Sequence, residues 1–133
     1  DSSGVNYADI MRRQGNYPGP DLPSTLGIES AGTICEVGDT VEGLTVGQRV
    51  LAMGPQGNAE YVAVNANFAF PYPETTDPVQ AGGMAVVFLT SYHILKTRGQ
   101  IKTGDTVLIH AHYNMGCGGS SWANDIKSPL GEV

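Results

Sequence analysis

Turn residues recur at short intervals along the middle of this chain, and they constrain its fold more than any other feature. Gly-Asp at 38–39 and the single glycines at 43, 47, 54 and 57 separate short runs in which apolar and polar residues alternate. Such spacing, with a strand about every eight to twelve residues, is typical of a β-barrel or a sandwich. We expect strands in ESAGTICEVG (29–38), at 49–53, in AEYVAV (59–64) and in NFAF (67–70).

Two segments break this pattern and predict helices. Residues 5–14 favour a short helix ended by Gly15, and the prolines at 18, 20 and 23 predict a loop after it. Apolar residues at helical spacing fill 79–95, which predicts one helix or two helices broken near Gly82-Gly83. The run VLIHA at 107–111 then predicts a buried strand of the parallel-sheet type. The fold class is therefore mainly β with helices, an α+β chain.

Composition excludes several kinds of partner. The formal net charge is −6, and the seven basic residues never cluster beyond Arg12-Arg13, so we expect no nucleic-acid surface. No apolar run approaches the roughly 20 residues of a membrane span, and the N-terminal stretch lacks the features of a signal peptide. Cys35 and Cys117 could pair, but free thiols in a cytoplasmic protein are the favoured interpretation.

The histidines give only a weak metal signal. His110 and His112 would lie on one face of a strand, because side chains alternate there with period two. Neither cysteine has a CxxC partner, and a zinc site needs about four ligands at short spacing. We expect no metal, and a metal enzyme using these two histidines is the least favoured alternative.

Several motifs occur in an order that resembles a known family over residues 4 to about 111. They are GVNYADIMRRQGNYP, LPSTLGIESAGTICEVGDTVEGLTVGQRV, NAEYVAV, FLTSYHIL and IKTGDTVLIHA. Together they resemble the zinc-independent quinone oxidoreductase (zeta-crystallin-like) branch of the medium-chain dehydrogenase/reductase superfamily. The resemblance implies a GroES-like β-barrel catalytic domain at 1–100, the first strand of a vestigial Rossmann unit at 101–111, and an atypical linker-like tail at 112–133.

The resemblance also implies an activity and a set of site residues. Zinc-dependent relatives carry Cys at the position of Asn6 and His at that of Ile28, so this branch works without zinc. Hydride passes from NADPH to a quinone or an enone. Asn6 is implied at the contact between nicotinamide and substrate, Tyr17 as a catalytic phenol, and Thr90 as a partner of the nicotinamide carboxamide. Met11 stands where many relatives carry a second tyrosine, which weakens the case for acid catalysis by tyrosine.

Each of these residues also has a structural interpretation. Asn6 could close the turn before the helix, Tyr17 could anchor its loop at the surface, and Thr90 could bond a carbonyl of its own helix. With the resemblance we favour function for Asn6 and Thr90 and leave Tyr17 open. Three acidic residues are expected to be structural: Asp9, Glu29 and Glu60.

The glycine cluster GCGG at 116–119 follows VLIHA where a phosphate-binding turn would stand. It does not give G-x-G-x-x-G, because Ser121 occupies the third position, and it is more typical of a flexible connector. SPLGEV at 128–133 resembles a segment that precedes GVNYAD in the family, which suggests permutation, an engineered or truncated chain, or chance. Since a Rossmann domain supplies most contacts to the cofactor phosphates, we expect weak or absent NADPH binding by this chain alone. A titration giving micromolar affinity would contradict that expectation.

A second function stays open. The chain could be a catalytically inert truncated or rearranged domain that acts as a folding or oligomerisation module. Unpaired strand edges template association, so a homo-oligomer formed through exposed edges is the partner expected in that case. Whether the chain is an enzyme by itself is therefore not decided by its sequence.

Overall fold

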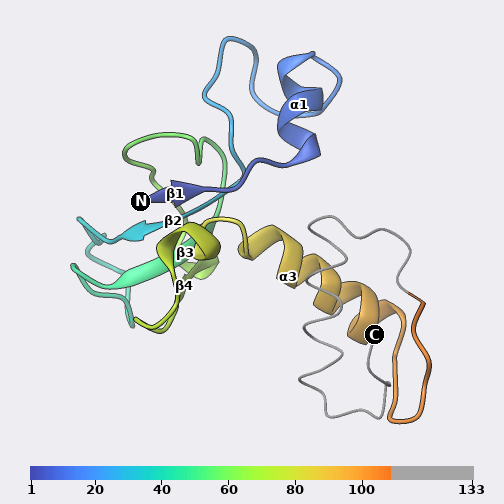
Figure 1. The fold of residues 1–133 in the computed structure, drawn as a ribbon. Coiled ribbons are helices and arrows are strands. Elements are labelled where there is room, and N and C mark those ends of the chain that lie inside the picture. The colour runs from blue at the N-terminus through green and yellow to red at the C-terminus, as the bar shows by residue number, and fades with distance from the viewer. Residues whose placement is uncertain (109–133) are drawn as a thin grey trace. The chain divides into compact units, whose positions relative to one another are not determined.

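A four-stranded antiparallel sheet forms the centre of the fold in the computed structural model, which describes residues 1–108. Its strands lie in the order β1-β2-β3-β4, as Figure 1 shows. They are β1 (Ser2–Ser3), β2 (Glu29–Thr33), β3 (Arg49–Met53) and β4 (Ala69–Pro71). The strand expected at 49–53 has the predicted bounds. The one expected in 29–38 ends already at Thr33, and the one expected in 67–70 begins only at Ala69, after a 3₁₀ helix.

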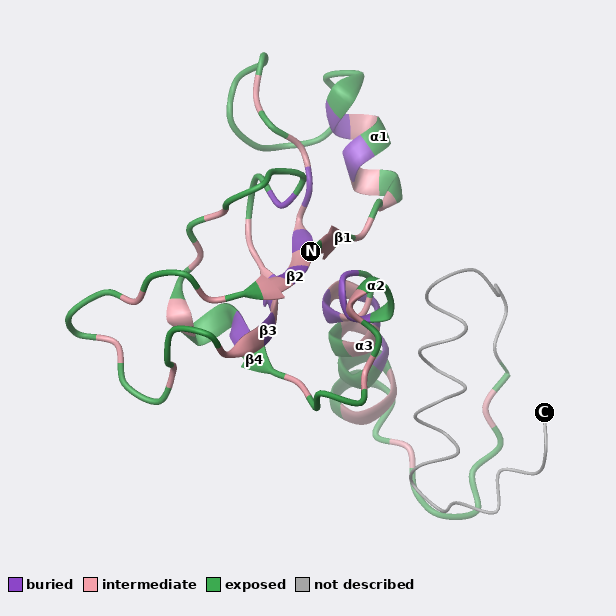
Figure 2. Cartoon of the chain, turned by 60° about the vertical axis from the view of Figure 1, so that its left-hand side comes forward, coloured by how far each residue is buried: buried purple, intermediate pink, exposed green. Residues whose placement is uncertain are grey.

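The register of β2 and β3 shows that the sheet buries side chains on both faces. Ala31 lies opposite Leu51, and Ser30 lies opposite Ala52. Because residues directly opposite each other share a face, Ala31 and Ala52 belong to different faces. Both are buried, as is Val50, which shares its face with Ala52 (Figure 2).

The helices follow the local signals of the sequence. Helix α1 (Tyr7–Arg13) ends just before Gly15, whose φ of 75° suits a residue without a Cβ. The loop after it contains a cis peptide bond between Leu22 and Pro23. A 3₁₀ helix, η1 (Ala66–Phe68), directly precedes β4.

Of the two alternatives for the second helical segment, one helix or two, the structure shows two helices. Helix α2 (Pro78–Ala81) begins at a proline, and the Asp77 side chain accepts a hydrogen bond from the Val79 N–H at 2.9 Å. A second helix, α3 (Ala85–Tyr92), starts after Gly82-Gly83 and continues into a π-helical turn, η2 (His93–Arg98). The two glycines therefore divide the segment into two helices.

The chain forms two compact units, Asp1–Ala85 and a second that begins at Val86. The sheet, α1 and α2 belong to the first unit, and most of α3 and all of η2 belong to the second. Residues 101–108 contain a turn and irregular backbone, without strand pairing up to Leu108. The rest of the predicted strand at 107–111, which includes His110, lies outside the described residues, as do His112, Cys117 and the glycine cluster. Cys35 is a free, exposed thiol.

One predicted strand is wrong. The segment 59–64 is irregular, although its side chains alternate as expected: Val62 and Val64 are half-buried, and Ala63 is exposed. The two valines line a large open hollow together with Val50 and Ala52 of the sheet. The alternating pattern predicts which side chains are more buried. A strand also needs a neighbouring strand with free N–H and C=O groups, and the pattern does not show whether one is present.

In the part of the chain that the structure describes, no helix has both the length and the apolar character needed to cross a bilayer.

Candidate functional site

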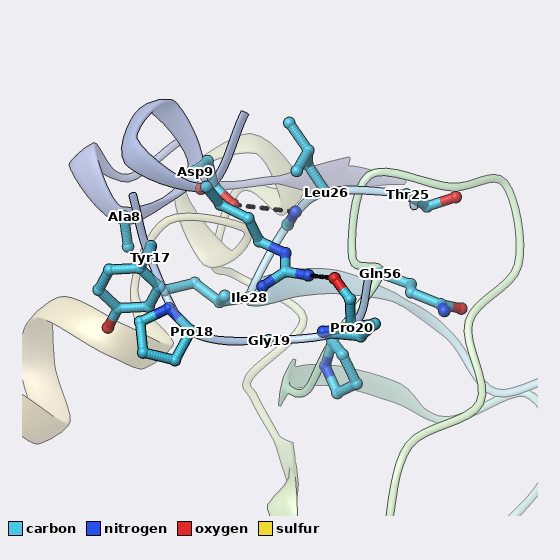
Figure 3. A pocket seen from close by; sticks show the side chains of 13 residues that line it. Ala8, Asp9, Tyr17, Pro18, Gly19, Pro20, Thr25, Leu26, Ile28 and Gln56 are labelled. Carbon is cyan, nitrogen blue, oxygen red and sulfur yellow. Dashed lines mark hydrogen bonds between the residues drawn. The ribbon is translucent and has the colours of Figure 1, made fainter. Parts of the chain in front are cut away.

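A small hollow in the first unit brings together α1, the proline-rich loop and the turn after β3. Its volume is about 170 Å³. Figure 3 shows Tyr17 and Pro18 at one side of it and Gln56 and Thr25 at the other. Its lining residues are Ala8, Asp9, Arg12, Tyr17, Pro18, Gly19, Pro20, Thr25, Leu26, Gly27, Ile28, Pro55 and Gln56.

The structure places Tyr17 and Ile28 in this same hollow. Tyr17 keeps 46% of its surface exposed, so its phenol is open to a ligand as well as to solvent. Ile28 is half-buried just before β2 and contributes only carbon atoms. The loop position of Tyr17 fits either a surface anchor or a site residue, and its catalytic role stays a prediction.

Asn6 occupies the N-cap position of α1, where its backbone N–H donates to the Asp9 side chain. Its side-chain Nδ2 also donates to Oε1 of Glu29 over 2.8 Å. Glu29 is almost fully buried, with 1% of its surface exposed, and an amide this close satisfies part of its need for donors. The contact fixes which end of the Asn6 amide faces Glu29 and therefore which end remains available to a ligand.

Asp9 connects α1 to the chain that enters β2. Its Oδ1 accepts from the Gly27 N–H at 2.9 Å, and its Oδ2 accepts from the Asn6 N–H at 2.8 Å. The side chain is 4% exposed, so both bonds lie in a largely water-free setting. Asp9 thus bonds the backbone at Asn6 and at Gly27, the residue before Ile28, from one position.

Arg12 is the site residue that sequence reasoning missed. The sequence pairs it with Arg13 as an ordinary basic residue, yet Arg12 is only 9% exposed and donates to the Pro20 carbonyl. Its neighbour Arg13 is exposed. The signal lay in the helical spacing, because Arg12 follows Asp9 by three residues and therefore shares a helix face with it.

Thr90 lies on α3 in the second unit, where it is half-buried. Among the described residues its hydroxyl makes no hydrogen bond, so the bond to a carbonyl of its own helix, which is the structural alternative for Thr90, is absent there. Tyr17 and Ile28 thus line one hollow of the first unit, whereas Asn6 caps the helix beside it without belonging to its lining. Thr90 lies on α3. Glu60 is exposed and lines no part of the small hollow.

The donor set at this site does not fit zinc. Ile28 has no lone pair, and Asn6 offers an amide, whereas zinc is bound by Cys, His and carboxylate side chains. Within residues 1–108 there is no group of three or more His, Cys, Asp or Glu residues that could hold a metal ion.

Comparison with known proteins assigns the family. The model of the alcohol dehydrogenase GroES-like domain matches residues 1–74, more than half of the chain. The chain belongs to this family. A GroES-like domain of the medium-chain dehydrogenase/reductase type is therefore the correct fold assignment, and it agrees with the antiparallel sheet and few helices described above.

Three relatives illustrate the similarity. A phenolphthiocerol/phthiocerol polyketide synthase of Mycobacterium tuberculosis is 35% identical over 111 residues, which are 83% of this chain and 5% of that protein. An alcohol dehydrogenase superfamily protein from Novosphingobium aromaticivorans has a TM-score of 0.87 and 32% identity, covering 92% of this chain and 40% of that one. The quinone oxidoreductase from Thermus thermophilus, also solved as its NADPH complex, has a TM-score of 0.72 and 34% identity, covering 92% and 38%. The GroES-like chain thus spans about two fifths of these solved relatives and a far smaller share of the synthase.

Proposed function

We propose that this GroES-like chain forms the part of an NADPH-dependent quinone or enone reductase that contacts the nicotinamide and the substrate. The observation that carries the proposal is the placement of Tyr17 and Ile28 in one hollow, against the helix that Asn6 caps. The similarity to a quinone oxidoreductase solved with NADPH supports the cofactor and the substrate class. The reaction is hydride transfer to a conjugated carbonyl without zinc, in a cytoplasmic protein.

NADPH, when bound, supplies the hydride. The chain's own residues position the partners and stabilise charge. The Nδ2 of Asn6 donates a hydrogen bond to Glu29. Its amide oxygen has two lone pairs and can accept a hydrogen bond from the N–H of the nicotinamide carboxamide. A contact of Thr90 with the nicotinamide carboxamide is proposed from the resemblance alone. The Tyr17 phenol donates to the substrate oxygen that gains negative charge as hydride arrives at the conjugated carbon.

Tyr17→Phe is expected to lower kcat/KM for quinone reduction at least about tenfold, because it removes only the donor to the developing oxyanion. Asn6→Ala and Thr90→Ala should instead raise KM for NADPH. Turnover is followed by the loss of NADPH absorbance with a quinone and with an enone as acceptors, at a large excess of NADPH that offsets weak binding by the chain alone. Tyr61→Phe is the matched control, since Tyr61 is 78% exposed and lies outside the small hollow.

Two results would contradict the proposal. One is an unchanged kcat/KM in Tyr17→Phe together with an unchanged KM for NADPH in Asn6→Ala. The other is no NADPH-dependent turnover by the unaltered chain under these conditions.

The alternative function, an inert folding or oligomerisation module, is favoured by one feature of the sheet. Among the described strands, β1 and β4 each pair on one side only, which leaves two outer edges. Unpaired edges can extend a sheet into a second copy of the chain. Size-exclusion chromatography with light scattering tests this alternative: a folded oligomer without reductase turnover would support it, and an active monomer would exclude it.

A further inference from the structure

The guanidinium of Arg12 is buried without a carboxylate partner. Arg12 is 9% exposed, and its side chain makes one hydrogen bond, from the guanidinium to the Pro20 carbonyl. No Asp or Glu among residues 1–108 forms an ion pair with it. A buried cation normally needs a partner of opposite charge, since its desolvation is costly.

Arg12 has donors that the Pro20 carbonyl does not use. A guanidinium carries five N–H donors in a planar fork, and the Pro20 carbonyl accepts from only one nitrogen. Within the described residues, Ser24 Oγ is the fully enclosed side-chain polar atom that lacks a partner. No nitrogen of Arg12 is enclosed in this way, so the nitrogens that make no hydrogen bond still have accessible surface. Arg12 and Tyr17 both line the hollow.

The other charged group in the lining is a carboxylate that already accepts hydrogen bonds from the backbone. Asp9 shares the hollow with Arg12, but its two oxygens accept the N–H groups of Gly27 and Asn6. The remaining lining is largely apolar, and Tyr17, Thr25 and Gln56 add side-chain donors. The hollow thus combines one open cation with carbon-rich walls.

We propose that this hollow binds the carboxylate of a small, apolar organic acid, with Arg12 as its anchor. A carboxylate matches the guanidinium fork with two parallel hydrogen bonds and carries the single negative charge that Arg12 can balance. A phosphate near neutral pH carries up to two negative charges, more than the single positive charge of Arg12 balances. At about 170 Å³ the hollow is below the roughly 300–1,000 Å³ of a drug-sized pocket, which suits a short acid.

This site also narrows the substrate class of the proposed reductase. If Tyr17 donates to the reacting carbonyl, Arg12 in the same hollow selects conjugated carbonyl compounds that bear a carboxylate. The choice of an unsaturated acid rests on the proposed function. The carboxylate site itself rests only on Arg12 and its surroundings.

The test measures binding to the chain without NADPH, by NMR chemical-shift titration. The probes are cinnamate, its neutral isostere cinnamamide, and inorganic phosphate. We expect cinnamamide and phosphate to bind at least about tenfold more weakly than cinnamate, because only the carboxylate forms the paired charge-assisted bonds. Arg12→Gln should weaken cinnamate binding about tenfold or more, and Arg12→Lys should weaken it less. Arg13→Gln, which alters the exposed neighbour, should leave it unchanged.

Equal binding of acid and amide, tighter binding of phosphate, or retention of cinnamate by a folded Arg12→Gln would overturn the proposal. If Arg12→Gln does not fold, the comparison of cinnamate with cinnamamide on the unaltered chain still decides. Cinnamate binding without quinone turnover would contradict only the proposed function. Quinone turnover without a preference for cinnamate over cinnamamide would contradict only this inference.

Discussion

Replacing Asp9 by alanine is expected to lower the free energy of unfolding by about 3–5 kcal/mol, a large part of the stability of a domain this size. The carboxylate accepts two backbone N–H groups, from Asn6 at 2.8 Å and from Gly27 at 2.9 Å. Each bond to a charged acceptor contributes roughly 1.5–3 kcal/mol, and removal of the carboxylate leaves both donors without a partner. Because the residue is 4% exposed, water cannot readily replace it.

Urea unfolding followed by circular dichroism measures this loss. Asp9→Asn should cost about half as much as Asp9→Ala, since the amide oxygen can keep one of the two bonds. Asp39→Ala is the matched control: Asp39 is exposed, so its change should stay within about 0.5 kcal/mol. Similar losses at both positions would show that Asp9 does not connect α1 to the chain before β2.

The elements that depend on local chemistry could be predicted from the sequence. Helix α1 stops just before a glycine, the second helical segment breaks at Gly82-Gly83, and β3 coincides with a short run bounded by turn residues. Each boundary is set by a residue whose own backbone preferences decide it. The irregular segment at 59–64 could not be predicted in this way, because a strand also needs a neighbour to bond with.

The site residues also fall into two classes: some could be identified from a local motif, and others depend on contacts between distant parts of the chain. Tyr17 and Ile28 could be nominated by a motif, and the structure places both in one hollow. The contact of Asn6 with Glu29 joins residues 23 positions apart, and no local pattern announces it. Arg12 and Arg13 are adjacent and of one type, yet the first is buried and the second is exposed. Only the placement of the loop carrying Pro20 over α1 distinguishes them.

Gly27→Ala is expected to cost about 2–4 kcal/mol of unfolding free energy, because that position combines a left-handed backbone with close packing. Its φ is 100°, and an added Cβ would lie 2.5 Å from the backbone nitrogen of Asn58. The segment cannot move aside freely, since the Gly27 N–H donates to Asp9 and its carbonyl accepts from the Gly57 N–H at 3.2 Å. A backbone movement that relieved the clash would therefore break the hydrogen bonds of Gly27 to Asp9 and to Gly57.

Gly43→Ala separates the two causes. Gly43 also has a positive φ, 80°, but nothing lies within 4 Å of an added Cβ, so only the backbone penalty of roughly 1–2 kcal/mol applies. Both losses are measured by the same urea unfolding experiment. A larger loss of unfolding free energy in Gly27→Ala than in Gly43→Ala would show the cost of the contact with Asn58. Equal losses would mean that the chain before β2 can move away from the added Cβ. In that case Ile28, the next residue, would not be held rigidly in the hollow, and the fixed site geometry on which the proposed chemistry depends would fail with it.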